Sequence, residues 1–193
     1  MADQLRLFVA CELPDDARRA LGGVQDDLRR LGADRLRWVR PEGIHVTLKF
    51  LGAVDEGRVA AITSALNGAI APFQLRLGFG KLGGFGGREV RVVWVRLEGD
   101  VPGLSELAGG IESALAPLGF PPERRPFAAH VTLARVPEQL PAALRRQLPD
   151  TLERYRPPPL PLMTLTEVSL MRSILGSGGS AYERVACFPR AGS

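Results

Sequence analysis

Cysteine, histidine, lysine, tryptophan and tyrosine each occur only twice in this 193-residue sequence. The two cysteines, Cys11 and Cys187, lie near opposite ends of the chain and form no Cys-x-x-Cys spacing. Zinc sites and dithiol redox motifs commonly use that spacing, so its absence argues against both classes of site. We interpret the cysteines as small buried residues of terminal strands in a reduced, cytoplasmic protein.

Long hydrophobic runs are also missing. The longest run near the start, residues 7–11, is far shorter than a signal-peptide core or a membrane span requires. With 45% hydrophobic and 24% charged residues, the composition is that of a soluble globular protein. We therefore expect no membrane association.

The charge is mildly basic, with a net value of +4, and only Lys49 and Lys81 among the 25 cationic residues are lysines. A basic protein suits a polyanionic ligand. However, an excess of arginine together with abundant alanine, glycine and proline is typical of a genome-wide compositional bias. The arginines as a group are thus weak evidence for nucleic acid, and each must be argued from its position.

Hydrophobic periodicity predicts an alternation of strands and helices. Strands are expected at 5–10, 36–39, 44–51, 73–77, 90–97 and 127–136, and helices at 14–31, 59–70, 104–118 and around 140–148. A hairpin of residues 165–171 and 182–188 closes the chain, and its loop, 176–180, is interpreted as too long for a tight turn. The order strand–helix–strand–strand recurs about twice, which predicts an α+β fold with an internal pseudo-repeat.

Two further segments have a distinctive composition. Residues 80–87 are rich in glycine and superficially resemble a phosphate-binding loop, but they lack the Gly-Lys-Ser/Thr ending and precede a strand, so we interpret them as a loose hairpin. Residues 155–161 contain four prolines and are expected to form a stiff, extended connector across the surface.

The strongest feature is a repeated tetrapeptide. His45-Val46-Thr47-Leu48 recurs as His130-Val131-Thr132-Leu133, 85 residues later, and the two copies contain both histidines of the chain. Three matching residues after a histidine arise by chance about 3 times in 10,000 for this composition. A single His-x-Thr on a strand is most often structural, but two identical copies that hold every histidine indicate catalysis.

Strand geometry indicates how each copy is used. Side chains alternate between the faces of a strand, so His45 and Thr47 share one face, as do His130 and Thr132. The valine and leucine of each copy then face the core. If the two halves pack about a pseudo-two-fold axis, two His–Thr pairs face each other across a cleft and can clamp one small anion.

These groups suit in-line attack on a phosphodiester. A neutral imidazole can accept a proton and an imidazolium can donate one near neutral pH. Threonine hydroxyls can donate hydrogen bonds to the oxygens on which charge builds up at phosphorus. Because the sequence has no carboxylate cluster or His-rich spacing for a metal, we expect acid–base catalysis with no metal and no cofactor.

Four other residues are weighed by their position. Lys49 shares the strand parity of His45 and Thr47 and is expected to add charge to the pocket. Arg135 has the parity of Leu133, which points it away from the cleft unless the strand ends or bulges there. Phe50 and Trp38 are either core residues or stacking surfaces for a base, and the core is the favoured interpretation for each.

The paired motifs resemble those of the two-histidine phosphoesterase superfamily, and within it the RNA 2′,3′-cyclic phosphodiesterases, historically named 2′-5′ RNA ligases. The resemblance covers nearly the whole chain. It is carried by 6–10 with Pro14, by 38–39 ahead of 45–52, by Phe127 with 130–135, and by 173–175 followed by Tyr182. The proline that usually precedes the second histidine is Ala129 here, a change at the strand edge that we expect to leave the chemistry intact.

The resemblance implies a single two-lobed domain over residues 1–193, in which two pseudo-symmetric antiparallel sheets flank a central cleft and the helices lie outside. It implies hydrolysis of an RNA terminal 2′,3′-cyclic phosphate to a 2′-phosphomonoester, with His45 as proton donor to O3′ and His130 as proton acceptor from water. It also implies a related ATP-independent 2′-5′ joining reaction. Expected substrate contacts are Arg135, Lys49, Phe50 and Tyr182, and the protein is expected to be a monomer.

Two alternatives remain open at this point. The chain could be a non-catalytic module that binds RNA ends carrying a 2′,3′-cyclic phosphate and releases them unchanged. It could also apply the same chemistry to a small nucleotide, such as a cyclic phosphate of ADP-ribose. Neither the physiological RNA nor the base preference follows from the sequence.

Overall fold

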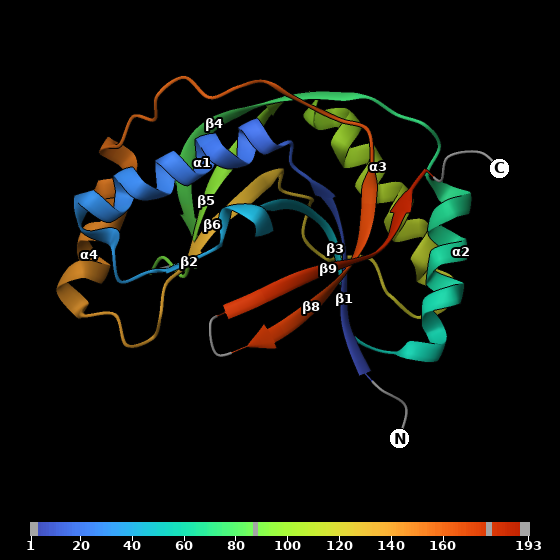
Figure 1. Ribbon diagram of the computed structural model, residues 1–193. Coiled ribbons are helices and arrows are strands. Elements are labelled where there is room, and N and C mark those ends of the chain that lie inside the picture. Colours follow the sequence, from blue (N-terminus) through green and yellow to red (C-terminus); the bar gives the residue numbers. More distant parts are fainter. Residues whose placement is uncertain (1–3, 87–88, 177–178, 190–193) are drawn as a thin grey trace.

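The computed structural model describes residues 4–86, 89–176 and 179–189 of the chain. In chain order the elements are β1 Gln4–Glu12, α1 Asp15–Leu28, β2 Arg37–Trp38, β3 His45–Asp55, α2 Val59–Ala69, β4 Leu75–Phe85, β5 Val92–Gly99, α3 Val101–Leu115, β6 His130–Arg135, α4 Ala142–Arg154, β7 Met163–Leu165, β8 Val168–Gly176 and β9 Gly179–Phe188 (Figure 1). Short helical turns occupy Arg29–Ala33, Pro41–Gly43, Glu56–Arg58 and Ala116–Leu118.

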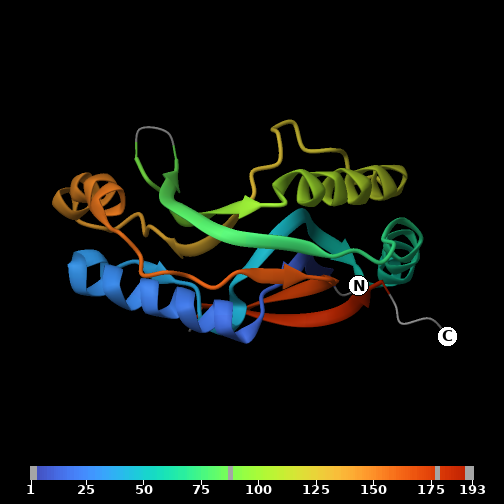
Figure 2. The same ribbon diagram turned by 90° about the horizontal axis from the view of Figure 1, so that it is seen from above.

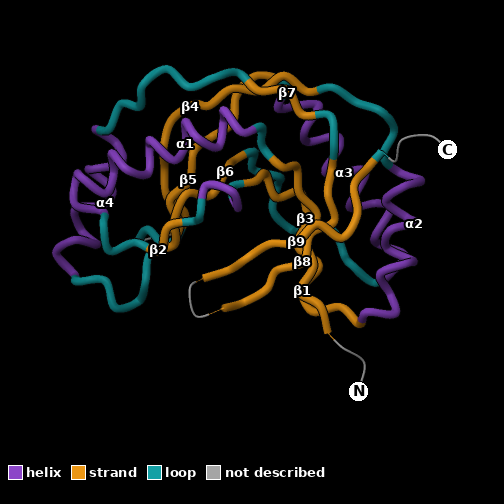
Figure 3. Tube along the Cα trace, viewed as in Figure 1, coloured by secondary structure: helices purple, strands orange, loops and turns teal. Residues whose placement is uncertain are grey.

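The strands form two antiparallel sheets (Figure 3). The four-stranded sheet has the order β3-β1-β8-β9, and the five-stranded sheet has the order β2-β6-β5-β4-β7. The two halves of the sequence exchange strands, because β2 pairs with β6 in the larger sheet and β8 pairs with β1 in the smaller one. Strands β3 and β6 contact each other between the sheets. The expected α+β architecture with two antiparallel sheets is confirmed.

The helices lie outside the sheets. Helices α1 and α4 occupy one end of the molecule and α2 and α3 the other (Figure 1), and in the view from above α3 and α4 lie along one side and α1 along the opposite side (Figure 2). In α1 the residues Ala17, Leu21 and Val24 recur at helical spacing and are fully buried. Asp15 and Asp16 occupy its first turn, where carboxylates interact favourably with the helix dipole.

The core positions the two repeated motifs. Val46 and Val131 are fully buried in one large hydrophobic core that includes residues of both sheets. Burying a valine side chain stabilises a fold by roughly 1.5–3 kcal/mol, so each valine fixes which face of its strand turns inward. A second, small cluster of Phe8, Ala10 and Met171, with Tyr182 packed against it, lies apart from the large core.

The glycine-rich segment is the main difference from the sequence-based prediction. Residues 80–85 belong to a hairpin, as predicted, but not to a loose connection: they form the second half of β4, which pairs with β5 as far as Phe85. A Cβ atom built on Gly83 would approach the Trp94 ring within 2.5 Å. Glycine is therefore needed here because the aromatic side chain of the neighbouring strand packs directly over the backbone of β4.

The end of the chain also differs. Leu165 belongs to β7, which pairs with β4, rather than to the closing hairpin. The prediction that 176–180 forms a long loop is wrong, because pairing of β8 with β9 continues to Gly176 opposite Gly179. Residues 177 and 178 lie outside the described residues. In addition, α4 extends through Pro149 to Arg154, beyond the expected end near 148.

No helix of the described ranges is both long and apolar enough to cross a membrane.

Candidate active site

The two motifs begin β3 and β6 and alternate as their sequences predict. His45 and Thr47 are half-buried, whereas Val46 and Leu48 are buried; the same pattern holds from His130 to Leu133. Each strand thus presents an imidazole and a hydroxyl on the face opposite the core. Because β3 and β6 contact each other, the two His–Thr pairs lie in the same region of the molecule.

One nitrogen of each imidazole is held by a matching backbone contact. The Nδ1 atom of His45 lies 2.7 Å from the carbonyl oxygen of Gly43, and the Nδ1 atom of His130 lies 2.6 Å from that of Ala128. In both cases the acceptor is the residue two positions before the histidine. A carbonyl accepts only, so Nδ1 carries the hydrogen and Nε2 is left to exchange a proton with a ligand.

Aromatic rings surround each imidazole. The ring of His45 lies 4.8 Å from that of Phe8 and 5.1 Å from that of Tyr182, and the ring of His130 lies 4.9 Å from that of Phe85. A Cβ atom on Gly43 would lie 3.1 Å from the Tyr182 ring, so glycine lets this ring pack closely against the residue whose carbonyl orients His45. These aromatic contacts, together with the hydrogen bond at Nδ1, restrict the orientation of both imidazole planes.

A β-bulge follows the threonine in β3. Thr47 and Lys49 are opposite consecutive residues of β1, so Leu48 is an extra residue without a partner in register. An extra residue reverses the alternation of faces beyond it. Consequently Phe50, rather than Lys49, returns to the face of His45, and its side chain is 62% exposed. The prediction that Phe50 belongs to the core is wrong.

The prediction that Lys49 shares the face of the histidine is wrong for the same reason. Its ammonium group is buried on the far side of the strand, 2.9 Å from a carboxylate oxygen of Glu112 in α3 and 2.9 Å from the carbonyl oxygen of Pro121. Lys49 therefore anchors β3 to α3, and this position does not support contact with a substrate in the cleft.

The same bulge occurs in β6. Thr132 and Ala134 are opposite consecutive residues of β5, which makes Leu133 the extra residue. Arg135 is thereby turned to the face of His130 and Thr132. Simple alternation predicted the opposite face, and the exception made for a bulge is the case that applies. Phe50 and Arg135 thus occupy equivalent positions, five residues after their histidines.

The bulge in β6 is braced by the first half of the chain. The carbonyl oxygen of Leu133 accepts hydrogen bonds from the backbone N–H of Val39 at 2.9 Å and from Nε2 of Gln25 at 3.0 Å. Gln25 is fully buried in α1. Each motif strand is therefore held at its bulge by a buried polar side chain and a helix from the other half of the sequence, α1 for β6 and α3 for β3.

A cleft of about 510 Å³ opens on this face of both strands. It is lined by six of the predicted site residues, His45, Thr47, Phe50, Thr132, Arg135 and Tyr182. His130 is adjacent to the cleft, two residues before Thr132 on the same face. The described residues that line the cleft include two arginines and no carboxylate, which favours an anionic ligand.

The polar residues of the cleft that sequence reasoning missed include Arg6 and Ser173. They form one row across the four-stranded sheet with Tyr182, because Arg6 is opposite Ser173 and Ser173 is opposite Tyr182. All three line the cleft. The available signal at Arg6 was a charged side chain between the apolar residues of β1, whereas Ser173 follows Arg172 in β8 and gave no comparable signal. Arg96 was also missed; it is directly opposite His130 on β5.

The surroundings of His45 change its proton affinity. Burial lowers the pKa of His45 below its ordinary value of 6.5, and the positive charge of His130 acts in the same direction. The hydrogen bond to Gly43 and the negative charge of Glu12 oppose this shift in the pKa. The imidazolium of His45 in the free protein is thus a stronger acid than that of an exposed histidine, and an anion bound in the cleft would oppose this shift.

Groups of three or more His, Cys, Asp or Glu that could hold a metal are not found among the described residues.

Comparisons with known proteins agree with this geometry. The family model of the 2′-5′ RNA ligase superfamily matches residues 13–176. The RNA 2′,3′-cyclic phosphodiesterase of Archaeoglobus fulgidus is 31% identical over 188 residues, which cover 95% of this chain and 99% of that protein. The corresponding protein of Methanothermobacter thermautotrophicus is 30% identical over 191 residues, 96% of this chain and 98% of that protein.

Solved structures give the same result. The apo crystal structure of E. coli LigT matches with a TM-score of 0.72 at 25% identity, over 96% of this chain and 97% of that one. LigT has also been crystallised with 3′-AMP, and that structure matches with a TM-score of 0.72 at 25% identity, over 96% of this chain and 98% of that one. The two His-x-Thr motifs, the fold that joins them and these matches together show that the chain belongs to the 2′-5′ RNA ligase superfamily.

Proposed function

We propose that the protein hydrolyses RNA terminal 2′,3′-cyclic phosphates to 2′-phosphomonoesters. The observation that carries this proposal is the matched pair of imidazoles on β3 and β6, each with Nδ1 bound to a carbonyl two residues earlier and a threonine on the same face. Two proton-transfer groups and two hydroxyl donors around one anion suit in-line hydrolysis of a phosphodiester. The names of the full-length relatives support this choice of substrate.

In the proposed reaction, Nε2 of neutral His130 accepts a proton from water while the water oxygen attacks phosphorus. The bond between phosphorus and O3′ breaks, and protonated His45 gives its Nε2 proton to O3′. Thr47 and Thr132 donate hydrogen bonds to the non-bridging oxygens, where charge accumulates. The products are a 2′-phosphate and a free 3′-hydroxyl, and exchange of protons with solvent restores the starting state of both histidines.

A 5′-hydroxyl in the place of water would give a 2′-5′ phosphodiester by the same proton transfers. This joining reaction needs no ATP, because one P–O bond of the cyclic phosphate is exchanged for another. Joining needs a second RNA end in the site, whereas hydrolysis needs only water. Assays with and without 5′-hydroxyl RNA therefore distinguish the two reactions.

Product identity tests the proposal. RNA that ends in a 2′,3′-cyclic phosphate is incubated with the protein in EDTA, and the products are separated by chromatography and mass. We expect the 2′-phosphate; a 3′-phosphate would contradict the assigned leaving group, and recovery of bound but unchanged RNA would favour the non-catalytic module. Adding excess 5′-hydroxyl RNA tests joining, and a cyclic phosphate of ADP-ribose tests the small-nucleotide alternative.

The protonation of His45 gives an independent prediction. NMR titration of the free protein is expected to show a midpoint below 6.5 for His45, because burial disfavours the imidazolium. The chain has only two histidines, so the His130→Gln variant assigns both signals. Removing the positive charge of His130 is expected to raise the pKa of His45, and Glu12→Gln is expected to lower it further. Inorganic phosphate is expected to raise it in the wild type; no response to any of these changes would contradict the described environment.

A further inference from the structure

The cleft continues into a second hollow through Arg135. An open groove of about 1320 Å³ lies between the end of the five-stranded sheet and the start of α4. Arg135 lines both this groove and the cleft that contains His45, Thr47 and Thr132. A chain molecule whose end occupies the cleft can therefore extend into the groove past one shared side chain.

The charged residues that line the groove are mainly cations. Its charged residues are the five arginines Arg37, Arg91, Arg135, Arg145 and Arg146 and the two glutamates Glu89 and Glu138. Arg145 is engaged within the protein, since it lies 3.2 Å from a carboxylate oxygen of Glu89 and donates to the carbonyl oxygens of Pro137 and Glu138. The other four side chains are exposed.

Two of these arginines are forced together by strand register. Arg37 of β2 is directly opposite Arg135 of β6. Directly opposite residues of antiparallel strands project from the same face, and like charges in this position destabilise a sheet. Among the described residues, neither guanidinium has a carboxylate partner that offsets this repulsion. A bound anion between them would do so.

We propose that this groove binds the phosphodiester backbone of the RNA strand immediately 5′ of the cyclic phosphate, through Arg37, Arg91 and Arg146, with Arg135 at the junction with the cleft. The inference rests on the proposed function for the position of the terminal phosphate. Successive backbone phosphates each carry a single negative charge, which several exposed guanidinium groups in one groove can bind. The groove thereby distinguishes an oligonucleotide from a mononucleotide with the same cyclic end.

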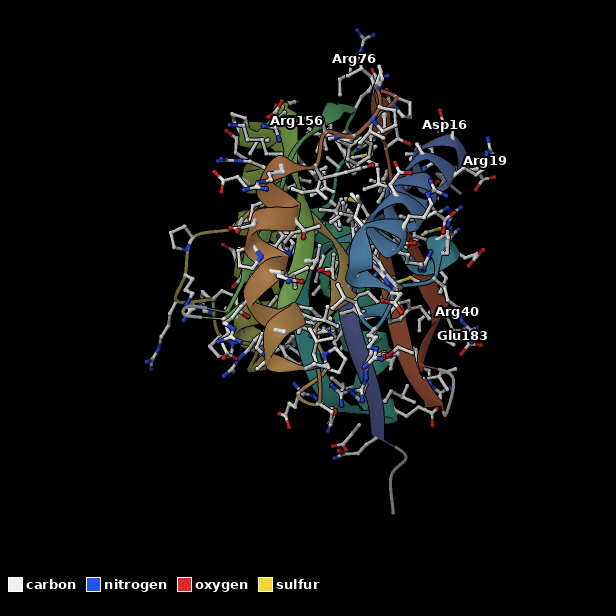
Figure 4. All side chains as sticks on the ribbon, turned by 90° about the vertical axis from the view of Figure 1, so that its left-hand side faces the viewer. Asp16, Arg19, Arg40, Arg76, Arg156 and Glu183 are labelled. Atoms are coloured by element: carbon white, nitrogen blue, oxygen red, sulfur yellow. The ribbon has the colours of Figure 1, made fainter. Side chains whose placement is uncertain are left out.

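The test compares two triple variants with an equal reduction in positive charge. The groove variant is R37Q/R91Q/R146Q, which leaves the cleft residues unchanged. The control is R19Q/R76Q/R156Q. It replaces three exposed arginines that line neither the groove nor the cleft. Figure 4 labels all three, in the half of the molecule where α4 ends. Two readouts are used: kcat/KM on a cyclic mononucleotide and on a cyclic-ended oligonucleotide, and the Kd of an RNA oligonucleotide ending in 2′-phosphate at several salt concentrations.

We expect the groove variant to fall roughly tenfold or more in kcat/KM on the oligonucleotide and to match the wild type on the mononucleotide. Its slope of log Kd against log salt should decrease by about 0.7 for each backbone phosphate that no longer binds an arginine. Equal effects in both triple variants, equal effects on both substrates, or no advantage of the oligonucleotide in the wild type would each overturn the proposal. If the wild type hydrolyses neither substrate, the proposed function fails, while the Kd comparison still decides the role of the groove.

Discussion

Replacing either His45 or His130 by alanine is expected to reduce turnover of a 2′,3′-cyclic phosphate by about 10²- to 10⁴-fold, the range typical for loss of one positioned proton-transfer group. Each Nε2 is oriented by a single Nδ1 contact, 2.7 Å for His45 and 2.6 Å for His130. The two groups act in one step, so the double variant should be little worse than the poorer single variant. Steady-state kinetics with circular dichroism as a control for folding would measure this.

The roles of the two histidines can be separated by the leaving group. When sulfur replaces O3′ in the substrate, the leaving group departs as a thiolate, which needs little protonation. His45→Ala should then recover most of its activity on this substrate, whereas His130→Ala should remain impaired because the water must still be activated. Recovery by His130→Ala instead would reverse the assignment. Near wild-type turnover by either variant on the natural substrate would exclude the mechanism itself.

Replacing Glu112 by leucine is expected to destabilise the fold by about 3–5 kcal/mol, because it leaves the ammonium group of Lys49 buried and unpaired. Lys49 is 3% exposed and Glu112 supplies its carboxylate partner at 2.9 Å. For a domain of this size the destabilisation corresponds to a fall in Tm of roughly 6–20 °C. Thermal unfolding monitored by circular dichroism measures the change.

The matched control is the double variant K49M/E112L. Replacing both members of a buried ion pair by apolar residues is often neutral or stabilising, so this variant should restore most of the decrease in Tm. If the single variant unfolds like the wild type, Lys49 is not confined as its contacts indicate. If the double variant is as unstable as the single one, the destabilisation comes from packing around Glu112 rather than from the stranded charge.

The repeated motif allowed much of the site to be predicted from sequence, up to a definite point. Alternation places the histidine, valine, threonine and leucine of each copy correctly, because hydrophobic burial fixes the face of each strand. One residue later the prediction fails for Lys49 and Phe50. The bulges at Leu48 and Leu133 cannot be seen in the hydrophobic pattern. Simple alternation also places each leucine in the core, so the pattern up to the leucine is the same with or without a bulge.

The polar contacts made at the two bulges join residues that are distant in sequence. Gln25 reaches the carbonyl of Leu133 across 108 positions, and Lys49 reaches Pro121 across 72. Likewise, the row from Arg6 to Ser173 depends on the pairing of β1 with β8. The glycine-rich part of β4 was misassigned because its need for glycine comes from the Trp94 ring of the neighbouring strand. Local propensity carries no information about such contacts.

The contacts of Gln25 with β6 and of Lys49 with α3 limit how the two sides of the cleft can move. Two lobes that face a ligand often close over it as rigid bodies about a hinge. Here α1 is bonded to the motif strand of one sheet and α3 to that of the other, and β2 and β8 each complete the opposite sheet. The two sheets are thus joined by strands and helices that come from both halves of the sequence. We therefore expect the two His–Thr pairs to have the same spacing in the free protein and in the substrate complex, so that binding needs no closure of the sheets.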